Sequence, residues 1–288
     1  MMLSVEQSPA PTSVDERITA ERQELKYLLA AERLEPLVAE LSRELPSHRF
    51  VGEGANRLPD PNHYVTTIYF DTPSRRNYKD AIANVEANVK FRAKEYYDLH
   101  PSLAELATDP DHIVRYQPWL WFELKRKQGT HTTKQRLRVP KRAMQSLFED
   151  GQVMPQALLL PELGLDGSAW SGLDAIVGYC QELDEPLEAS CLVNYRRLSF
   201  QSEDGALRVT IDLGLTFYLP PPDLWTRTRA LVRDGLGRAR GGVGEAVLEL
   251  KQRAATPAWL ERALGRAGVH PVPFSKFAAA SGAVHGPL

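Results

Sequence analysis

The sequence predicts an α+β protein built on a closed antiparallel β-barrel, with a charged lumen and flanking helices. Several segments alternate apolar and charged residues with the period of a β-strand. These segments are rich in lysine and arginine although the whole chain carries a net charge of only −2. Long antiparallel strands also leave exposed edges, and closing the sheet into a barrel removes them.

The composition is that of a globular protein and limits the possible partners. With 43% hydrophobic and 25% charged residues, the chain has enough apolar material for a substantial core. Because the net charge is close to zero, a cationic site must be local, and nucleic acid is not an expected partner. We expect no membrane segment in this chain and a cytoplasmic location, with Cys180 and Cys191 reduced.

The expected elements follow from periodicity and from turn residues. Residues 1–20 are expected to be a disordered lead, and residues 21–288 a single domain. Apolar residues at helical spacing predict helices over 31–46, 140–151, 172–183 and 256–268. Alternating or β-branched stretches predict strands over 63–73, 88–99, 119–138 (a hairpin), 189–200, 206–219 and 245–253. A loop rich in Pro, Gly and Arg separates the last two strands.

Sorting each strand by side-chain parity gathers the charges on one face. The shared faces are Lys90/Arg92/Lys94/Tyr96, Glu123/Lys125/Lys127, Lys134/Arg136/Arg138, Tyr195/Arg197, Arg208/Thr210/Asp212 and Glu249/Lys251/Arg253. The opposite faces are apolar, as in Leu207/Val209/Ile211/Leu213. A sheet with one core face and one solvated face is the alternative explanation of this alternation. The strong bias toward Lys and Arg favours the barrel, because solvated faces mix both signs.

A lumen lined by so many cations requires an anion. Like charges a few ångströms apart repel one another, and burial adds the cost of desolvation. A chain of phosphates relieves both, since Arg and Lys are the natural phosphate donors. The interspersed glutamates would repel phosphate unless a divalent cation bridges them, and Mg²⁺ or Mn²⁺ suits oxygen ligands.

The sequence also resembles the VTC domain, the polyphosphate polymerase domain of the vacuolar transporter chaperone family, within the triphosphate tunnel metalloenzymes. Eight segments carry the resemblance in sequence order: RQELKYLL, TTIYFDTP, VKFRAKEYY, FELKRK with the following K.R, NYRRLSF, LRVTIDLGL, VLELKQ and FSKF. The resemblance implies a tunnel of about eight antiparallel strands that binds ATP, another nucleoside triphosphate, polyphosphate or pyrophosphate. It further implies transfer of the terminal phosphoryl group to a growing polyphosphate chain with Mn²⁺ or Mg²⁺.

The resemblance also implies roles for particular residues. The phosphate-binding cations of the family match Lys26, Arg92, Lys94, Lys125, Lys134, Arg136, Arg197 and Lys276, and Tyr195 and Ser275 match its hydroxyl partners of phosphate. Among these, the expected catalytic clamp is Lys26, Arg92, Lys125, Arg197 and Lys276. Lys90, Arg208 and Lys251 share the charged faces and are further phosphate-binding candidates. Glu249 matches the metal-binding glutamate, and Glu24 and Glu123 are second candidates.

Two departures from the family pattern bear on the reaction. The superfamily opens with Glu-x-Glu-x-Lys, but Arg22 stands at the first position here, which weakens a hydrolase-type metal site and agrees with the VTC branch. Lys94 stands where arginine is more usual, so a bidentate fork is lost while the charge is kept. Two alternatives to the polymerase stay open: a tripolyphosphatase or nucleoside triphosphatase with the same tunnel, and a non-catalytic polyphosphate-binding module.

Overall fold

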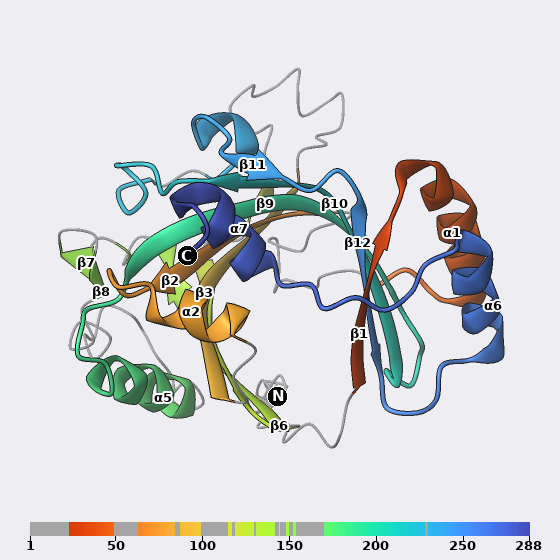
Figure 1. Cartoon of the computed structure of the whole chain (residues 1–288), viewed down its shortest axis with the longest axis horizontal. Coiled ribbons are helices and arrows are strands. Elements are labelled where there is room, and N and C mark those ends of the chain that lie inside the picture. The colour runs from red at the N-terminus through yellow and green to blue at the C-terminus, as the bar shows by residue number, and fades with distance from the viewer. Residues whose placement is uncertain are drawn as a thin grey trace, which may run out of the picture.

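The computed structural model describes residues 23–48, 63–83, 87–98, 115–116, 119–129, 131–141, 144, 148–149, 152–153, 170–227 and 230–288. Within them one large antiparallel sheet dominates, with helices packed around it (Figure 1). The predicted α+β class with an antiparallel sheet is therefore confirmed. The expected lead at residues 1–20 lies outside the described residues.

The main sheet has the strand order β1-β12-β10-β9-β2-β3-β5-β6. Its strands are β1 (Gln23–Leu29), β2 (His63–Asp71), β3 (Ala87–Asp98), β5 (Trp119–Gln128), β6 (His131–Pro140), β9 (Glu188–Gln201), β10 (Leu207–Tyr218) and β12 (Ala246–Gln252). The short strands β4 (Arg115–Tyr116), β7 (Phe148–Glu149), β8 (Gln152–Val153) and β11 (Gly241–Gly242) pair at its margins. The helix expected over 140–151 lies mostly outside the described residues, and Phe148–Glu149 within it is a strand instead.

The sheet is arched but not closed, so the predicted closed barrel is wrong. Among the described strands, no backbone pairing joins the edge strands β1 and β6. One reason is that part of the free edge of β1 is already occupied, because Val272 N donates to Lys26 O at 2.8 Å. The arch is nevertheless tight: β1 and β5 are six spacings apart, about 29 Å in a flat sheet. Lys125 Nζ on β5 lies 3.5 Å from Glu24 Oε2 on β1, so the two walls meet through side chains.

Two apolar clusters cover the outer surface of the arch. Helices α1 (Ala31–Glu44) and α6 (Ala258–Ala267) pack on β1, β10 and β12, burying Leu41 and Leu260 completely. Helix α5 (Trp170–Gln181) packs on β5 and β6. These are the helices predicted over 31–46, 256–268 and 172–183. Each fully buried leucine contributes about 1.5–3 kcal/mol, which fixes the apolar faces outward and leaves the charged faces for the inside.

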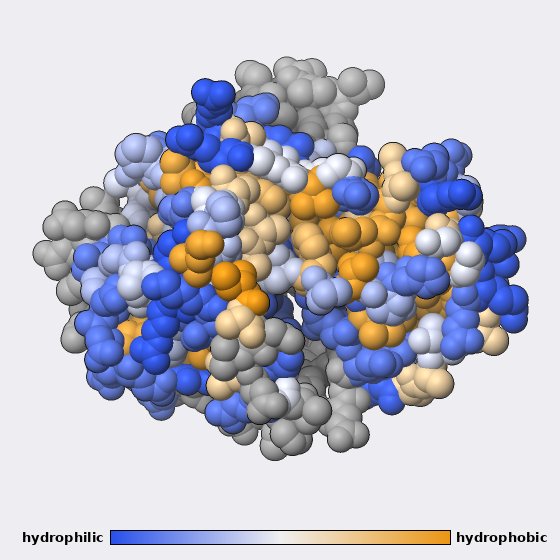
Figure 2. Space-filling view, in the orientation of Figure 1, coloured by the Kyte–Doolittle hydropathy of each residue, from blue (hydrophilic) through white to orange (hydrophobic). Residues whose placement is uncertain are grey.

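A third cluster lies inside the arch. It is built on the inward side of β2, β9, β10 and β12 and is covered by α7 (Lys276–His285) and α2 (Arg76–Ile82). The surface is hollowed between the half that carries α5 and the half that carries α1 and α6 (Figure 2). None of the described helices has the length and apolar character that crossing a membrane requires.

The segment expected as a loop between the last two long strands is packed against the sheet. It contains β11 and a 3-10 helix, η7 (Arg233–Gly235). Leu231 is 3% exposed, its N–H donates to Glu95 Oε2 at 2.8 Å, and its carbonyl accepts from Thr66 Oγ1 at 2.6 Å. These bonds attach the segment to the outer side of the arch.

Candidate functional site

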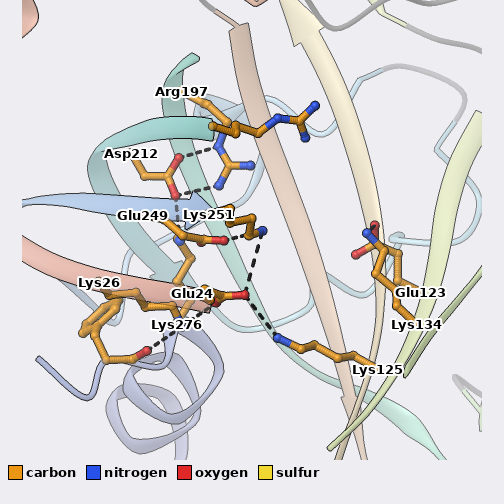
Figure 3. A network of polar contacts seen from close by, with 12 residues as sticks. Glu24, Lys26, Glu123, Lys125, Lys134, Arg197, Asp212, Glu249, Lys251 and Lys276 are labelled. Carbon is orange, nitrogen blue, oxygen red and sulfur yellow. Dashed lines mark hydrogen bonds and ion pairs between the residues drawn. The ribbon is translucent and has the colours of Figure 1, made fainter. Parts of the chain in front are cut away.

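The register places the predicted basic residues on one face. Residues paired across neighbouring strands point to the same side of a sheet. Following the pairs from β1 to β6 therefore defines the concave side, which we call the inner face (Figure 3). Its cross-strand pairs include Lys26–Glu249, Asp212–Arg197, Arg92–Glu123 and Lys125–Lys134.

Glu123 on β5 is a fully buried carboxylate surrounded by four cations. Its Oε1 accepts from Arg136 Nε at 2.7 Å and lies 3.3 Å from Lys134 Nζ. Its Oε2 accepts from Arg92 Nε at 2.8 Å and lies 3.2 Å from Lys94 Nζ. Burial raises the pKa of this carboxyl, but the four cations outweigh burial and hold the pKa well below its usual range. Glu123 is therefore ionised and fixes cations from β3 and β6 in place.

Asp212 on β10 forms a second enclosed centre. Its carboxylate, which is fully buried, accepts from Arg197 Nε at 2.6 Å and Nη2 at 2.8 Å, and lies 2.6 Å from Lys276 Nζ. Burial raises its pKa, but Arg197 and Lys276 lower it below the ordinary value. The ring of Tyr195 lies under both cations, each 5.3 Å from its centroid. Asp212 was not among the predicted site residues, although it shares the parity of Arg208 along the strand.

Glu24 and Glu249 form a third, more open centre on β1 and β12. Their side chains are 28% and 11% exposed. The ammonium of Lys251 contacts Glu249 and lies 4.0 Å from Glu24 Oε2, and Lys26 Nζ lies 3.3 Å from Glu24 Oε1. Burial and Glu249 raise the pKa of the Glu24 carboxyl, but three neighbouring lysines lower it to about 2. Burial also raises the pKa of Glu249, but Lys251 and other neighbouring cations hold it well below its usual range. Both carboxylates are therefore ionised, and a single cation can lie close to both.

Two lysines keep unusual pKa values on the inner face. Lys90 Nζ donates to Ser275 Oγ at 3.3 Å, and burial together with Lys26 lowers the pKa of Lys90 to about 7. Burial also lowers the pKa of Lys134 to about 7, although Glu123 opposes that change. Ser275 in turn caps α7 by accepting from Ala278 N at 3.3 Å.

All sixteen predicted site residues lie in the described part of the chain. Their roles stay predictions, but fifteen gather around the three carboxylate centres and the start of α7: Glu24, Lys26, Lys90, Arg92, Lys94, Glu123, Lys125, Lys134, Arg136, Tyr195, Arg197, Glu249, Lys251, Ser275 and Lys276. Arg208 differs, because its Nε donates to Gln201 Oε1 at 2.6 Å and it also contacts His48. The hydroxyl of Thr67, next to Lys94 in the register, is buried without a hydrogen-bond partner, and Thr67 was not among the predicted site residues.

The fold and this face together define a class: an α+β protein whose arched sheet carries its cations inside. The chain belongs to the VTC domain family, whose model matches residues 21–285. No curated protein matches the chain. Among solved structures, a Bacillus halodurans protein described as a "putative adenylate cyclase" is 13% identical, with 89% of this chain and 96% of that chain covered and a TM-score of 0.42. That likeness is too distant to support an argument about function.

The divalent cation that the family implies fits one of the three centres. No group of three or more His, Cys, Asp or Glu side chains that could hold a metal occurs among the described residues. A hard cation such as Mg²⁺ needs only one or two carboxylates when phosphates and waters complete its coordination. Glu24 and Glu249 meet that need, since the Lys251 ammonium already lies beside both. Glu123 does not, because four cations surround it and it is fully buried.

Proposed function

We propose that this domain binds the triphosphate of ATP, or a polyphosphate chain, on its inner face and transfers a terminal phosphoryl group as a polyphosphate polymerase. One observation supports this most strongly. The three carboxylate centres and the start of α7 gather ten basic residues against four carboxylates, a formal excess of six positive charges in a chain whose net charge is −2: Lys26, Lys90, Arg92, Lys94, Lys125, Lys134, Arg136, Arg197, Lys251 and Lys276 against Glu24, Glu123, Asp212 and Glu249. Only a ligand with several closely spaced negative groups neutralises such an excess.

The arrangement of the cations supports a role in phosphoryl transfer. This reaction depends on positioning and charge neutralisation more than on covalent participation by the protein. Arg92 on β3 and Arg197 on β9 come from the two strands that flank β2, and buried carboxylates orient both guanidinium groups. Lys125 reaches across the opening of the arch toward β1. These side chains would hold successive phosphates in line without large rearrangement.

Glu24 and Glu249 would hold the divalent cation on the β1 side. When bound there, Mg²⁺ or Mn²⁺ supplies positive charge to the phosphate oxygens during transfer. Lys251 would move away from Glu249 and become available to phosphate. Glu123 takes no part in metal binding in this proposal and instead orients Arg92 and Arg136.

A hydrolase is the second candidate. In that reaction, water replaces the growing chain as the acceptor of the phosphoryl group. The position of α7 favours this reading, since the helix covers the inner apolar cluster at one end of the arch and restricts how an acceptor chain approaches. A binding module without catalysis would use the same cations and no acceptor.

Product analysis separates these possibilities. Purified protein is incubated with ATP, Mn²⁺ and a short polyphosphate primer, and products are resolved by gel and by phosphate assay. Long chains support the polymerase, free phosphate supports the hydrolase, and binding without turnover supports the module.

Two adjacent variants of β5 supply the matched control. Lys125 points to the inner face, while Arg126 points outward and pairs with Glu182 at 2.9 Å. We expect Lys125→Gln to lower turnover about tenfold or more and Arg126→Gln to leave it unchanged. Equal effects of the two substitutions would contradict the use of the inner face.

A further inference from the structure

The inner face consists of two parts with different chemistry. One part carries the cations, and the other is apolar: Val65, Tyr69, Cys191, Val193, Leu215, Phe217 and Val247. On β10 the two parts stay on one side of the sheet because of a bulge between Leu213 and Thr216, where Gly214 adopts a φ of 59°. All seven of these residues are buried, and none is more than 5% exposed. This part of the arch is therefore filled and dry.

The C-terminal segment closes this end of the arch from wall to wall. Its backbone pairs with β1 through Val272, and Phe274 O accepts from Lys26 Nζ at 2.8 Å. Ser275 Oγ then accepts from Lys90 on β3, across the opening from β1. Lys276 contacts Asp212 on β10 at 2.6 Å. We call residues 272–285 the C-terminal cover; Figure 3 shows its start beside Lys26 and Lys276.

The cover is anchored over its whole length. Phe277 is 1% exposed and packs on Tyr69, with ring centroids 5.1 Å apart. At its far end, His285 Nε2 contacts Ser190 O at 2.9 Å, and directly after the cover Arg75 Nη2 donates to Gly286 O at 2.9 Å. Lifting the cover would expose Phe277 and the apolar residues that it buries, so it is a fixed wall and not a gate.

We propose that the C-terminal cover is a stop for the phosphate chain, so that the inner face binds the free end of a linear polyphosphate and no chain passes beyond α7. This inference rests on the proposed function and specifies which part of the substrate the site recognises. A chain that enters the arch meets apolar, filled space at the cover. Its terminal phosphate then lies at the start of α7.

The groups at this closed end suit a terminal phosphate better than an internal one. A terminal phosphate carries up to two negative charges and three unshared oxygens, whereas an internal phosphate carries one charge and two such oxygens. Lys26, Lys90 and Lys276 converge there from three elements, next to the Ser275 hydroxyl. On the same face, the Thr67 hydroxyl lies between Lys94 and Val193 in the register, is 1% exposed and has no hydrogen-bond partner.

End-blocked chains test the proposal. Long polyphosphate with free ends is compared with the same material after both terminal phosphates are converted to amides of a small neutral amine. The internal charge is unchanged, so general electrostatic attraction is matched. Binding is measured by competition with tripolyphosphate at fixed ionic strength and without divalent cations, so that no turnover occurs. We expect the blocked chain to bind at least about tenfold more weakly.

Two serine variants locate the preference along the inner face. Ser275→Ala should weaken binding of the free-ended chain and leave binding of the blocked chain unchanged. The ratio of the two affinities should therefore fall. Ser199→Ala is the matched control, because Ser199 lies on the same face of β9 but four residues beyond Tyr195, away from the cover. Equal binding of free and blocked chains would overturn the inference while leaving the proposed function intact. If neither chain nor tripolyphosphate binds, the proposed function fails, and the inference fails with it.

Discussion

The carboxylates of the inner face fall into two kinds, and their difference separates structural anchors from candidate metal ligands. Glu123 and Asp212 are fully buried, and every cation around them is held at close range. Glu24 and Glu249 keep part of their surface exposed and share the ammonium of Lys251, whose side chain is 35% exposed. A fully buried carboxylate holds the cations around it in fixed positions. A carboxylate that is partly exposed to solvent can release a lysine ammonium and bind a metal ion in its place.

The same comparison explains how the protein tolerates its cations in the absence of a ligand. Each enclosed carboxylate neutralises part of the charge and orients arginine side chains in advance. Pre-orientation lowers the entropy cost of binding a polyanion later. The remaining excess of charge on the face is then available to the ligand.

Replacing Glu123 should have the largest effect. Glu123→Gln leaves four cations around a neutral amide inside the protein, and breaking such a buried pair costs about 3–5 kcal/mol. Urea unfolding measures this loss. The exposed Glu182→Gln, which removes the partner of Arg126, is the control and should change stability little. Tripolyphosphate should stabilise both variants by binding the folded state, and Glu123→Gln by more, because it neutralises the four cations that the amide leaves unpaired. Equal losses of stability in both variants without ligand would contradict the anchor role.

Replacing Glu249 should affect turnover more than stability. We expect Glu249→Gln to lower phosphoryl transfer about 100-fold, with tripolyphosphate binding largely kept, because the amide weakens the metal site. A titration of Mn²⁺ against turnover should shift to higher concentrations. Glu245→Gln, an exposed acidic position just before β12, is the matched control. An unchanged Mn²⁺ titration would remove Glu249 from the metal site.

Side-chain parity predicted the inner face because alternation along a strand is a property of the backbone itself. Parity predicted that Lys125 points inward and its neighbour Arg126 outward, and likewise for Arg197 and its neighbour Arg196. The strand register agrees with both predictions. Strict alternation does not continue past Gly214. A bulge adds one residue there, so Asp212 points inward before the bulge and Leu215 points inward after it. Such an insertion leaves only a glycine as its sign in the sequence.

The closed barrel was predicted from the need to protect strand edges, and the protein meets that need differently. Val272 occupies part of the free edge of β1, and Lys125 and Glu24 connect the walls without a backbone ladder. Contacts between segments that are more than a hundred residues apart have no local pattern. Glu123 was grouped with the metal candidates for a different reason: its four partners lie on the neighbouring strands β3 and β6, and their contacts with its carboxylate become visible only when the strands are paired.

Arg197 offers a test of geometry at constant charge. Its guanidinium makes two hydrogen bonds to Asp212, which an ammonium cannot reproduce. We expect Arg197→Lys to weaken tripolyphosphate binding about tenfold, or about 1.4 kcal/mol, by calorimetry. Arg196→Lys changes the adjacent residue, which points to the outer side of β9, and should bind as the unaltered protein does. Similar affinities for the two variants would show that only net charge matters at this position.

The smallest expected effect is on the number of protons that the protein binds. The pKa values of Lys90 and Lys134 are about 7 in the folded protein against an ordinary 10.5, chiefly because of burial. A folded state that binds fewer protons than the unfolded state gains stability as pH rises from about 7 toward 10, and thermal unfolding of the free protein should follow that direction. A bound polyanion favours the charged lysines, so binding near pH 7.5 should take up protons.

Calorimetry in buffers of different ionisation enthalpy measures that uptake. Because tripolyphosphate itself exchanges protons, Lys134→Arg is the necessary comparison, since a guanidinium stays charged throughout this range. The unaltered protein should take up a fraction of a proton more than the variant. Identical uptake would mean that Lys134 is already charged before the ligand arrives, and that Glu123 compensates its burial completely.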